Sequence, residues 1–296
     1  MTPKEIRGNL LLLLTALIWG SAFVAQSVGL DHLGAFSFNG LRTLLGAFAV
    51  MPVALMMQRR QATSGSLKTS LVGGAVCGLI LFAASNLQQW GLVETSVGKA
   101  GFITALYILF VPLMGLTVGR KVTKLFVAAV GVAIAGMFLL TMRSGEGMAL
   151  GRGDLLVLMS AVIFAGHILA IDHYSPGANG AMMSMAQFFV SGALSLVAAL
   201  VTGEQIHGAA LMGAAGPILY SGILSCGVAY TLQIVAQKDV SPVVASLLMS
   251  LESVFAALCG WLVLKEALSP RELAGCALVF ASVILAQWPS AKRADQ

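Results

Sequence analysis

The sequence predicts an all-α integral membrane protein in which ten transmembrane helices form two five-helix repeats of opposite topology. Three observations predict this fold: an extremely apolar composition, ten apolar runs of bilayer length, and an internal repeat with a constant offset. Of the 296 residues, 58% are hydrophobic and only 10% are charged, and the mean hydropathy is +0.92. An average soluble domain has about 25% charged residues, and a disordered chain needs high charge and low hydrophobicity. Composition therefore excludes a soluble globular protein and a disordered one.

The apolar runs have the length that a membrane helix requires. A hydrocarbon core about 30 Å thick is crossed by about 20 apolar residues in helical conformation. None of the runs alternates between apolar and polar residues, as the strands of a membrane β-barrel would. We therefore expect helices over ten segments, namely 9–28, 35–57, 70–92, 96–118, 122–141, 154–172, 179–202, 212–236, 241–264 and 271–288.

The first run follows Lys4 and Arg7, as the apolar core of a secretory signal peptide would. It continues to about residue 28, however, which is longer than a typical signal core, and it also belongs to the repeat described below. We expect it to remain as a helix of the protein.

The connections between runs are short, so no soluble domain interrupts them. Residues 142–153 form one of the two longest connections, lie at the midpoint of the chain and are rich in glycine. This composition is typical of a flexible joint. It predicts two domains, 1–143 and 152–296.

An internal repeat relates the two halves. The letters GNLL at 8–11 return as GDLL at 153–156, and TALIW at 15–19 returns as SAVIF at 160–164. Leu87-Gln88 likewise matches Leu232-Gln233 at the same offset of 145 residues. Five spans per copy is an odd number, so the two copies must cross the membrane in opposite directions. Inverted repeats of this kind occur in many secondary transporters, whose binding site lies near the membrane midplane between the repeats.

The charges of the connections predict the orientation. Basic residues gather on the cytoplasmic side of membrane proteins. With the N-terminus inside, the inner connections hold eleven Lys and Arg residues: Lys4, Arg7, Arg59, Arg60, Lys68, Arg120, Lys121, Lys124, Lys238, Lys292 and Arg293. The outer connections hold four: Arg143, Arg152, Lys265 and Arg271. We therefore expect a multi-pass protein of the cell membrane (the inner membrane in a bacterium) with both termini in the cytoplasm. The net charge of +5 reflects this topology and gives no support to nucleic-acid binding.

The sequence resembles the ten-helix EamA-like branch of the drug/metabolite transporter superfamily along almost its whole length. The similarity is strongest over 251–266, LESVFAALCGWLVLKE, and continues in the small residues of 275–282. Other similar positions are LIWGS at 17–21, Arg42, and Gly91-Leu92. The sequence departs from the family at Lys121, where an acidic residue is frequent, and at Ser253, where a proline is frequent. The resemblance implies the transport of small metabolites, often outward.

Glu252 is the only acidic residue well inside a predicted span. A charge at that depth is costly, so such residues usually face a cavity, pair with a partner, or mark an ion or substrate pathway. Two interpretations remain open: Glu252 is a counterion for a substrate amine or a proton carrier, or it braces neighbouring helices. Tyr107 is its repeat equivalent and lies at the same depth.

Further polar and aromatic residues within the spans are candidates for substrate binding. Arg42 can extend to the lipid headgroups or pair with a substrate carboxylate. His167 suits helix packing better than metal binding, because no second ligand stands three or four residues away. Amides can orient a solute or join helices, and Trp19 can line a cavity. The complete candidate set is Glu252, Tyr107, Trp19, Asn86, Gln88, Gln89, His167, Tyr230, Gln233 and Arg42.

Known enzyme motifs are absent from the sequence. It contains no HExxH, no GxSxG and no GxxxxGK loop for ATP, and no carboxylate pair at mid-depth within helical reach. The four cysteines fall within spans and contain no CxxC pair. We therefore expect no metal, no cofactor and no enzymatic activity, and leave the oligomeric state open.

The favoured function is secondary transport, as an exporter of small metabolites such as amino acids that works by alternating access, with proton coupling as an option. Nucleosides, sugars or drugs are alternative solutes, and a uniporter is an alternative mechanism. A membrane-embedded enzyme and an assembly scaffold are the alternatives from other classes.

The orientation can be tested with a single cysteine introduced at Gly145, in the central connection. Because eleven basic residues against four place this connection outside, we expect a membrane-impermeant thiol reagent to label it in intact cells. Labelling only after the cytoplasmic side has been exposed would refute the predicted orientation.

Overall fold

The computed structural model describes residues 2–60, 66–95, 97–117, 119, 122–141, 151–264 and 269–287, and these are helical throughout apart from short turns. The central glycine-rich connection, Lys121 and several of the counted charges lie outside these residues. The elements in chain order are α1 (Pro3–Leu30), α2 (Ala35–Arg60), α3 (Leu67–Glu94), α4 (Val97–Ala105), α5 (Tyr107–Thr117), α6 (Lys124–Thr141), α7 (Arg152–Tyr174), η1 (Ser175–Gly177), α8 (Gly180–Thr202), α9 (Gly208–Leu219), η2 (Tyr220–Tyr230), α10 (Thr231–Ala236), α11 (Pro242–Met249), α12 (Glu252–Leu264) and α13 (Pro270–Gln287).

Eight helical stretches of the described chain are long and apolar enough to cross a membrane. They are Pro3–Leu30, Ala35–Arg59, Leu67–Glu94, Val97–Thr117, Arg152–Gly177, Gly180–Thr202, Gly208–Ala236 and Pro242–Cys259. Two shorter apolar helices, Lys124–Leu139 and Leu273–Leu285, coincide with the fifth and tenth predicted runs. The all-helical, multi-pass prediction is confirmed.

Local sequence signals set several helix ends. The Thr2 hydroxyl accepts a hydrogen bond from the Glu5 amide and the Glu5 carboxylate accepts one from the Thr2 amide, which forms a capping box ahead of Pro3. Asn179 caps α8 in the same way, since its side chain accepts from two amides of the first turn. The helix ends at Gly203, whose φ of +74° suits glycine.

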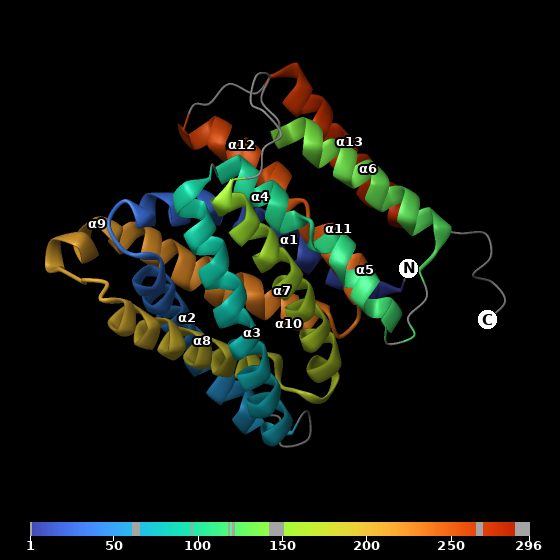
Figure 1. Ribbon diagram of the computed structural model, residues 1–296. Helices are drawn as coiled ribbons and strands as arrows, with labels where there is room; N and C mark the ends of the chain where they lie inside the picture. The colour runs from blue at the N-terminus through green and yellow to red at the C-terminus, as the bar shows by residue number, and fades with distance from the viewer. Residues whose placement is uncertain are drawn as a thin grey trace.

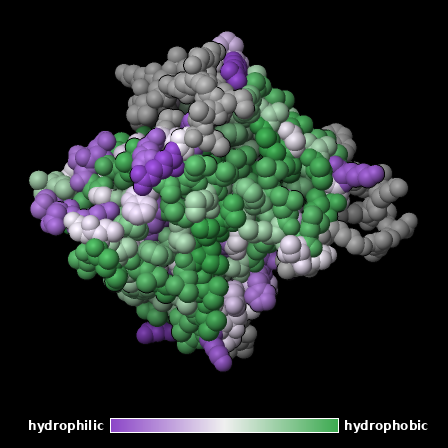
Figure 2. All heavy atoms as spheres, viewed as in Figure 1, coloured by the Kyte–Doolittle hydropathy of each residue, from purple (hydrophilic) through white to green (hydrophobic). Residues whose placement is uncertain are grey.

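The outer surface of the bundle is apolar. Figure 2 shows hydrophobic residues across most of the visible face, with hydrophilic residues gathered toward its edges. Leu200 and Val201 at the end of α8 are 79% and 83% exposed, which water would penalise and lipid tails do not. This surface fits a lipid bilayer.

The helices of the two halves of the chain interleave (Figure 1). α2 packs along α8, α3 packs against both α7 and α8, and α1 packs against α12 and η2. α6 and α13 pack along each other at one side of the bundle. Glycines allow close approach: a side chain at Gly20 would collide with α12 at Phe255, and one at Gly46 would collide with Cys226 of η2.

Two of the predicted spans are discontinuous. The fourth breaks at Leu106, between α4 and α5, and the ninth breaks at Ser250 and Leu251, between α11 and α12. At the second break, the hydroxyls of Ser250 and Ser253 donate to the carbonyls of Leu247 and Ser250. These bonds occupy backbone oxygens that a continuous helix would satisfy by itself. Neither break is visible in the hydropathy of the sequence.

The eighth span contains a second irregularity. Its middle third, η2, is a π-helix of 11 residues flanked by α9 and α10. π-helical segments are rare and frequently occur at functional sites. This segment supplies two of the cavity residues described below.

The packing of α3 on α8 can be tested at Gly74. A Cβ at this position would lie 2.5 Å from Ala186 Cβ and 2.7 Å from the Met183 carbonyl oxygen. We expect Gly74→Ala to lower the free energy of unfolding by about 1–3 kcal/mol, because an overpacked helix contact must shift. Gly166→Ala on α7 is the matched control, since a Cβ there meets no atom within 4 Å. Equal unfolding temperatures for the two variants in detergent would contradict this account.

Candidate functional site

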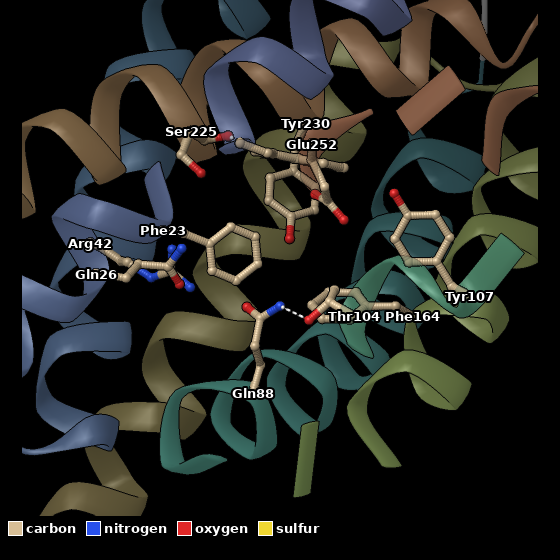
Figure 3. Close-up of a pocket in the computed structure, with 11 residues that line it drawn as sticks. Phe23, Gln26, Arg42, Gln88, Thr104, Tyr107, Phe164, Ser225, Tyr230 and Glu252 are labelled. Carbon is tan, nitrogen blue, oxygen red and sulfur yellow. Dashed lines mark hydrogen bonds between the residues drawn. The ribbon is translucent and has the colours of Figure 1, made fainter. Parts of the chain in front are cut away.

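A cavity lies among α1, α2, α3, α4, α5, α7, η2 and α12, and so combines helices from both halves (Figure 3). The space that a water-sized sphere can enter within it is about 40 Å³, and its empty space including the open side is about 380 Å³. The lining residues are Trp19, Phe23, Gln26, Arg42, Gln88, Thr104, Tyr107, Phe164, Ser225, Tyr230 and Glu252.

Arg42 provides the positive charge of the cavity. Its side chain is only 4% exposed, and its Nε donates a 2.7 Å hydrogen bond to Asn39 Oδ1. Asn39 is itself held, because its Nδ2 donates to the Ser85 carbonyl at 2.9 Å and to Asn86 Oδ1 at 3.0 Å. No carboxylate of the described residues forms an ion pair with this guanidinium. The expectation that Arg42 extends to the headgroups is therefore wrong: the network at Asn39 holds it inside the bundle.

Glu252 provides the acidic group of the cavity. It is the first residue of α12 and is 3% exposed, and its Oε1 has no hydrogen-bond partner among the described residues. Tyr107 is the first residue of α5 and is equally buried, and its hydroxyl interacts with the Glu252 carboxyl group. The two helix breaks thus bring two buried polar groups together in the middle of the bundle.

Aromatic rings form the wall between the charged groups. The rings of Trp19 and Tyr230 lie 4.6 Å apart, and Trp19 Nε1 donates to the Ser225 carbonyl at 3.3 Å. In the view of Figure 3, Phe23 and Tyr230 stand between the Arg42 guanidinium and the Glu252 carboxylate.

An amide and a hydroxyl complete the lining on one side. Gln88 Nε2 donates to Thr104 Oγ1 at 2.9 Å, which joins α3 to α4 beside the cavity. Gln26 Oε1 is buried without a partner among the described atoms. The cavity therefore offers both polar and aromatic contacts to a small amphipathic molecule.

Six of the ten residues singled out from the sequence line this cavity: Trp19, Arg42, Gln88, Tyr107, Tyr230 and Glu252. The other four are buried but do not line it, and three of them make buried polar contacts. Asn86 belongs to the Asn39 network, Gln89 donates to the Gln26 carbonyl, and His167 Nε2 lies 3.1 Å from Gln187 Oε1. Gln233 is buried on α10 and does not line the cavity.

Five lining residues escaped the sequence reasoning: Phe23, Gln26, Thr104, Phe164 and Ser225. Two of them had a usable signal. Gln26 is an amide within an apolar span, and Phe164 is the repeat equivalent of Trp19. Lys99 Nζ lies 2.7 Å from Asp154 Oδ2 and joins α4 to α7.

The hydrogen-bond network behind Arg42 can be tested at Asn39. Asn39→Ala leaves the Arg42 Nε, the Asn86 amide and the Ser85 carbonyl without their buried partner. We expect the free energy of unfolding to fall by about 1–3 kcal/mol. Thr202→Ala is the control, because its hydroxyl bonds only to carbonyls of its own helix end. If thermal unfolding in detergent shifted equally little for both, the network would have no stabilising role.

Comparison with known proteins gives the family. Residues 6–142 and 151–288 match the EamA-like transporter family. An "Uncharacterized transporter" of Archaeoglobus fulgidus is 30% identical over 285 residues, covering 95% of this chain and 86% of that protein. The "Uncharacterized inner membrane transporter YedA" of Escherichia coli is 23% identical over 274 residues, covering 91% of this chain and 87% of that protein.

Two further similarities are informative. A "Probable terminal-alkyne amino-acid exporter" of Streptantibioticus cattleyicolor is 29% identical over 137 residues, which is 46% of this chain and 45% of that protein. A solved crystal structure matches with a TM-score of 0.77 at 17% identity, covering 95% of this chain and 96% of the other, and shows the same fold. The match along nearly the whole chain shows that this multi-pass membrane protein belongs to the EamA-like transporter family, within the drug/metabolite transporter superfamily.

Proposed function

We propose that the protein is a secondary transporter that exports small metabolites such as amino acids through the central cavity by alternating access. The observation that carries this proposal is the cavity itself, which lies among helices of both halves and holds one buried cation and one buried carboxylate. Charged residues inside a membrane bundle usually mark a substrate or ion pathway. The relative named an amino-acid exporter supports the solute class, over part of its length.

The mechanism rests on ten spanning helices in two inverted repeats, residues 1–143 and 152–296. Two features support this arrangement. The break at Leu106 and the second break residue, Leu251, are separated by the repeat offset of 145 residues. The packing also recurs between equivalent helices: α1 contacts α12 as α7 contacts α5, and α3 contacts α7 as η2 contacts α1.

Access to the cavity is closed on one side by apolar packing. A buried apolar cluster joins the first half of α1, the second half of α7, α5 and α11. Leu12, Ile108, Ile168 and Leu248 are members of this cluster. With both termini in the cytoplasm, the cluster lies on the inner side, and Gln26, Arg42 and Gln88 lie on the outer side. The structure then corresponds to a state whose cavity is nearer the outside.

The interleaved packing suggests which helices move together. α3, α4 and α5 contact α7, whereas α1 contacts η2, α10, α11 and α12. We propose that these two groups, each containing helices of both repeats, tilt against each other around the cavity. Separation of α5 from α11 would open the inner side.

Two buried amides are the repeat equivalents of cavity residues and would line an inward-facing cavity in this cycle. Gln187 is the repeat equivalent of Arg42, and Gln233 is the repeat equivalent of Gln88. Gln187 Nε2 and Gln233 Oε1 are buried without partners among the described residues, and Gln187 Oε1 lies 3.1 Å from His167 Nε2. These amides would contact the solute or water after the inner side opens, which gives His167 and Gln233 a place in the transport cycle.

Proton coupling would act through Glu252. A carboxylate that alternately holds a proton and a solute ammonium exchanges one for the other, so outward solute movement is linked to inward proton movement. Glutamine at this position keeps the volume and hydrogen-bonding capacity but cannot ionise. In proteoliposomes, we expect Glu252→Gln to abolish solute accumulation driven by a pH gradient. Exchange of solute should persist at higher solute concentrations.

The control is Glu94→Gln at the end of α3, whose carboxylate lies near Arg152 on the surface, 3.6 Å away. We expect this variant to accumulate solute as the wild type does. Wild-type, pH-dependent accumulation by Glu252→Gln would assign the glutamate a purely structural role. Transport that ignores the pH gradient in the wild type would indicate a uniporter.

A further inference from the structure

We infer that the cavity recognises its solute as a zwitterion, with the carboxylate bound at Arg42 and the ammonium at Glu252 and Tyr107. This inference rests on the proposed transport function and specifies the solute class. It selects molecules that carry both charges together with an apolar or aromatic side chain.

The positive end of the site is set by the Arg42 guanidinium. A guanidinium has five N–H donors and matches a carboxylate with two parallel hydrogen bonds. One donor, Nε, is used by Asn39 at 2.7 Å, and that bond fixes the orientation of the planar group. The two terminal nitrogens of Arg42 form no hydrogen bond or ion pair with described residues, although the residue is only 4% exposed. A buried cation without a counterion is costly, so an anionic group of the solute is the natural partner.

The other end of the site, at Glu252 and Tyr107, needs a group that donates hydrogen bonds. An ionised carboxylate only accepts hydrogen bonds, whereas an ammonium donates three. Glu252 Oε1 and the Tyr107 hydroxyl are both buried next to each other, and no other described residue forms a hydrogen bond with either atom. Together they can accept two of the three donors of one ammonium group. The break between α11 and α12 holds Glu252 at the cavity, and the break between α4 and α5 does the same for Tyr107.

The protein keeps the two charges from neutralising each other. Arg42 and Glu252 form no ion pair in the described structure. The hydrogen bond to Asn39 holds the Arg42 side chain at α2, whereas Glu252 is the first residue of α12. Tyr230 is close enough to both Arg42 and Glu252 to interact electrostatically with each of them. A zwitterion placed along Tyr230 would compensate both charges at once. A sugar or nucleoside would leave both unpaired, and a simple amine or acid would leave one.

The wall between the charges favours an apolar side chain. Trp19, Phe23, Phe164 and Tyr230 present aromatic surface to the cavity. Aromatic rings contribute large apolar contact areas and pack well against other rings and aliphatic groups. Phenylalanine and leucine are therefore suitable probes.

The experiment measures uptake of labelled L-phenylalanine and L-leucine by proteoliposomes in competition with truncated analogues. Phenylalanine amide lacks the carboxylate, and 3-phenylpropionate lacks the ammonium. For the wild type, we expect unlabelled phenylalanine to compete at concentrations about tenfold or more below either analogue, because each lost charged contact is substantial. This comparison uses the wild-type protein alone and does not depend on how any variant folds.

Two variants assign the ends of the site. Arg42→Gln should remove the preference for phenylalanine over its amide and keep the preference over 3-phenylpropionate. Glu252→Gln should do the reverse. Arg152→Gln and Glu94→Gln, at an exposed surface pair, are the matched controls and should keep both preferences.

The outcomes separate this inference from the transport function. Equal competition by phenylalanine and both analogues, or uptake of nucleosides or sugars in place of amino acids, would overturn the zwitterion site and leave the transporter standing. An exchange of the two variant effects would also overturn it. No uptake of any amino acid, nucleoside or sugar by the wild type would overturn the proposed transport function itself.

Discussion

The structure depends on one constraint: a lipid bilayer offers the polypeptide backbone no hydrogen-bonding partner, so a break in a spanning helix is tolerated only inside the protein. Leu106 and the Ser250–Leu251 pair are such breaks, and both lie at the centre of the bundle. Serine hydroxyls bond the backbone carbonyls at the second break. Because α5 and α12 start at these breaks, Tyr107 and Glu252 are both placed at the cavity. The functional site therefore exists where the helical backbone is interrupted.

The same constraint explains why buried polar residues occur in connected groups. Arg42, Asn39 and Asn86 link α2 to α3, and Gln88 with Thr104 links α3 to α4. Each bond removes part of the cost of placing a polar group away from water. Some buried atoms without a hydrogen bond in the described structure, such as Gln26 Oε1 and Glu252 Oε1, belong to residues that line the cavity.

Much of the fold follows from composition, since apolar runs of bilayer length leave a helical bundle as the fitting class. The position of Glu252 in a span, and its equivalence to Tyr107 through the repeat, correctly directed attention to the cavity. Hydropathy cannot register the breaks or the π-helix, because these change hydrogen bonding and leave apolarity unchanged. Phe23 and Ser225 were missed for this reason: the first resembles any lipid-facing residue, and the second reaches the cavity through η2. Of the two interpretations of Arg42, extension to the headgroups is wrong, because Asn39 holds the side chain inside the bundle and the sequence does not show that these two residues bond.

The central claim is that the cavity between Arg42 and Glu252 is the path of the solute, and it can be tested most directly with a cysteine at Thr104. This residue lines the cavity, whereas Ser282 is buried on α13 and lines no part of it. Each variant carries one added cysteine beside the four native ones, and its rate of modification by a cationic methanethiosulfonate would be measured in liposomes. The rate measured for the wild type, which has only the four native cysteines, is subtracted as the background. We expect Thr104→Cys to react faster than Ser282→Cys and to be protected by the transported amino acid. A rate at Thr104→Cys that is unchanged by solute would contradict the account.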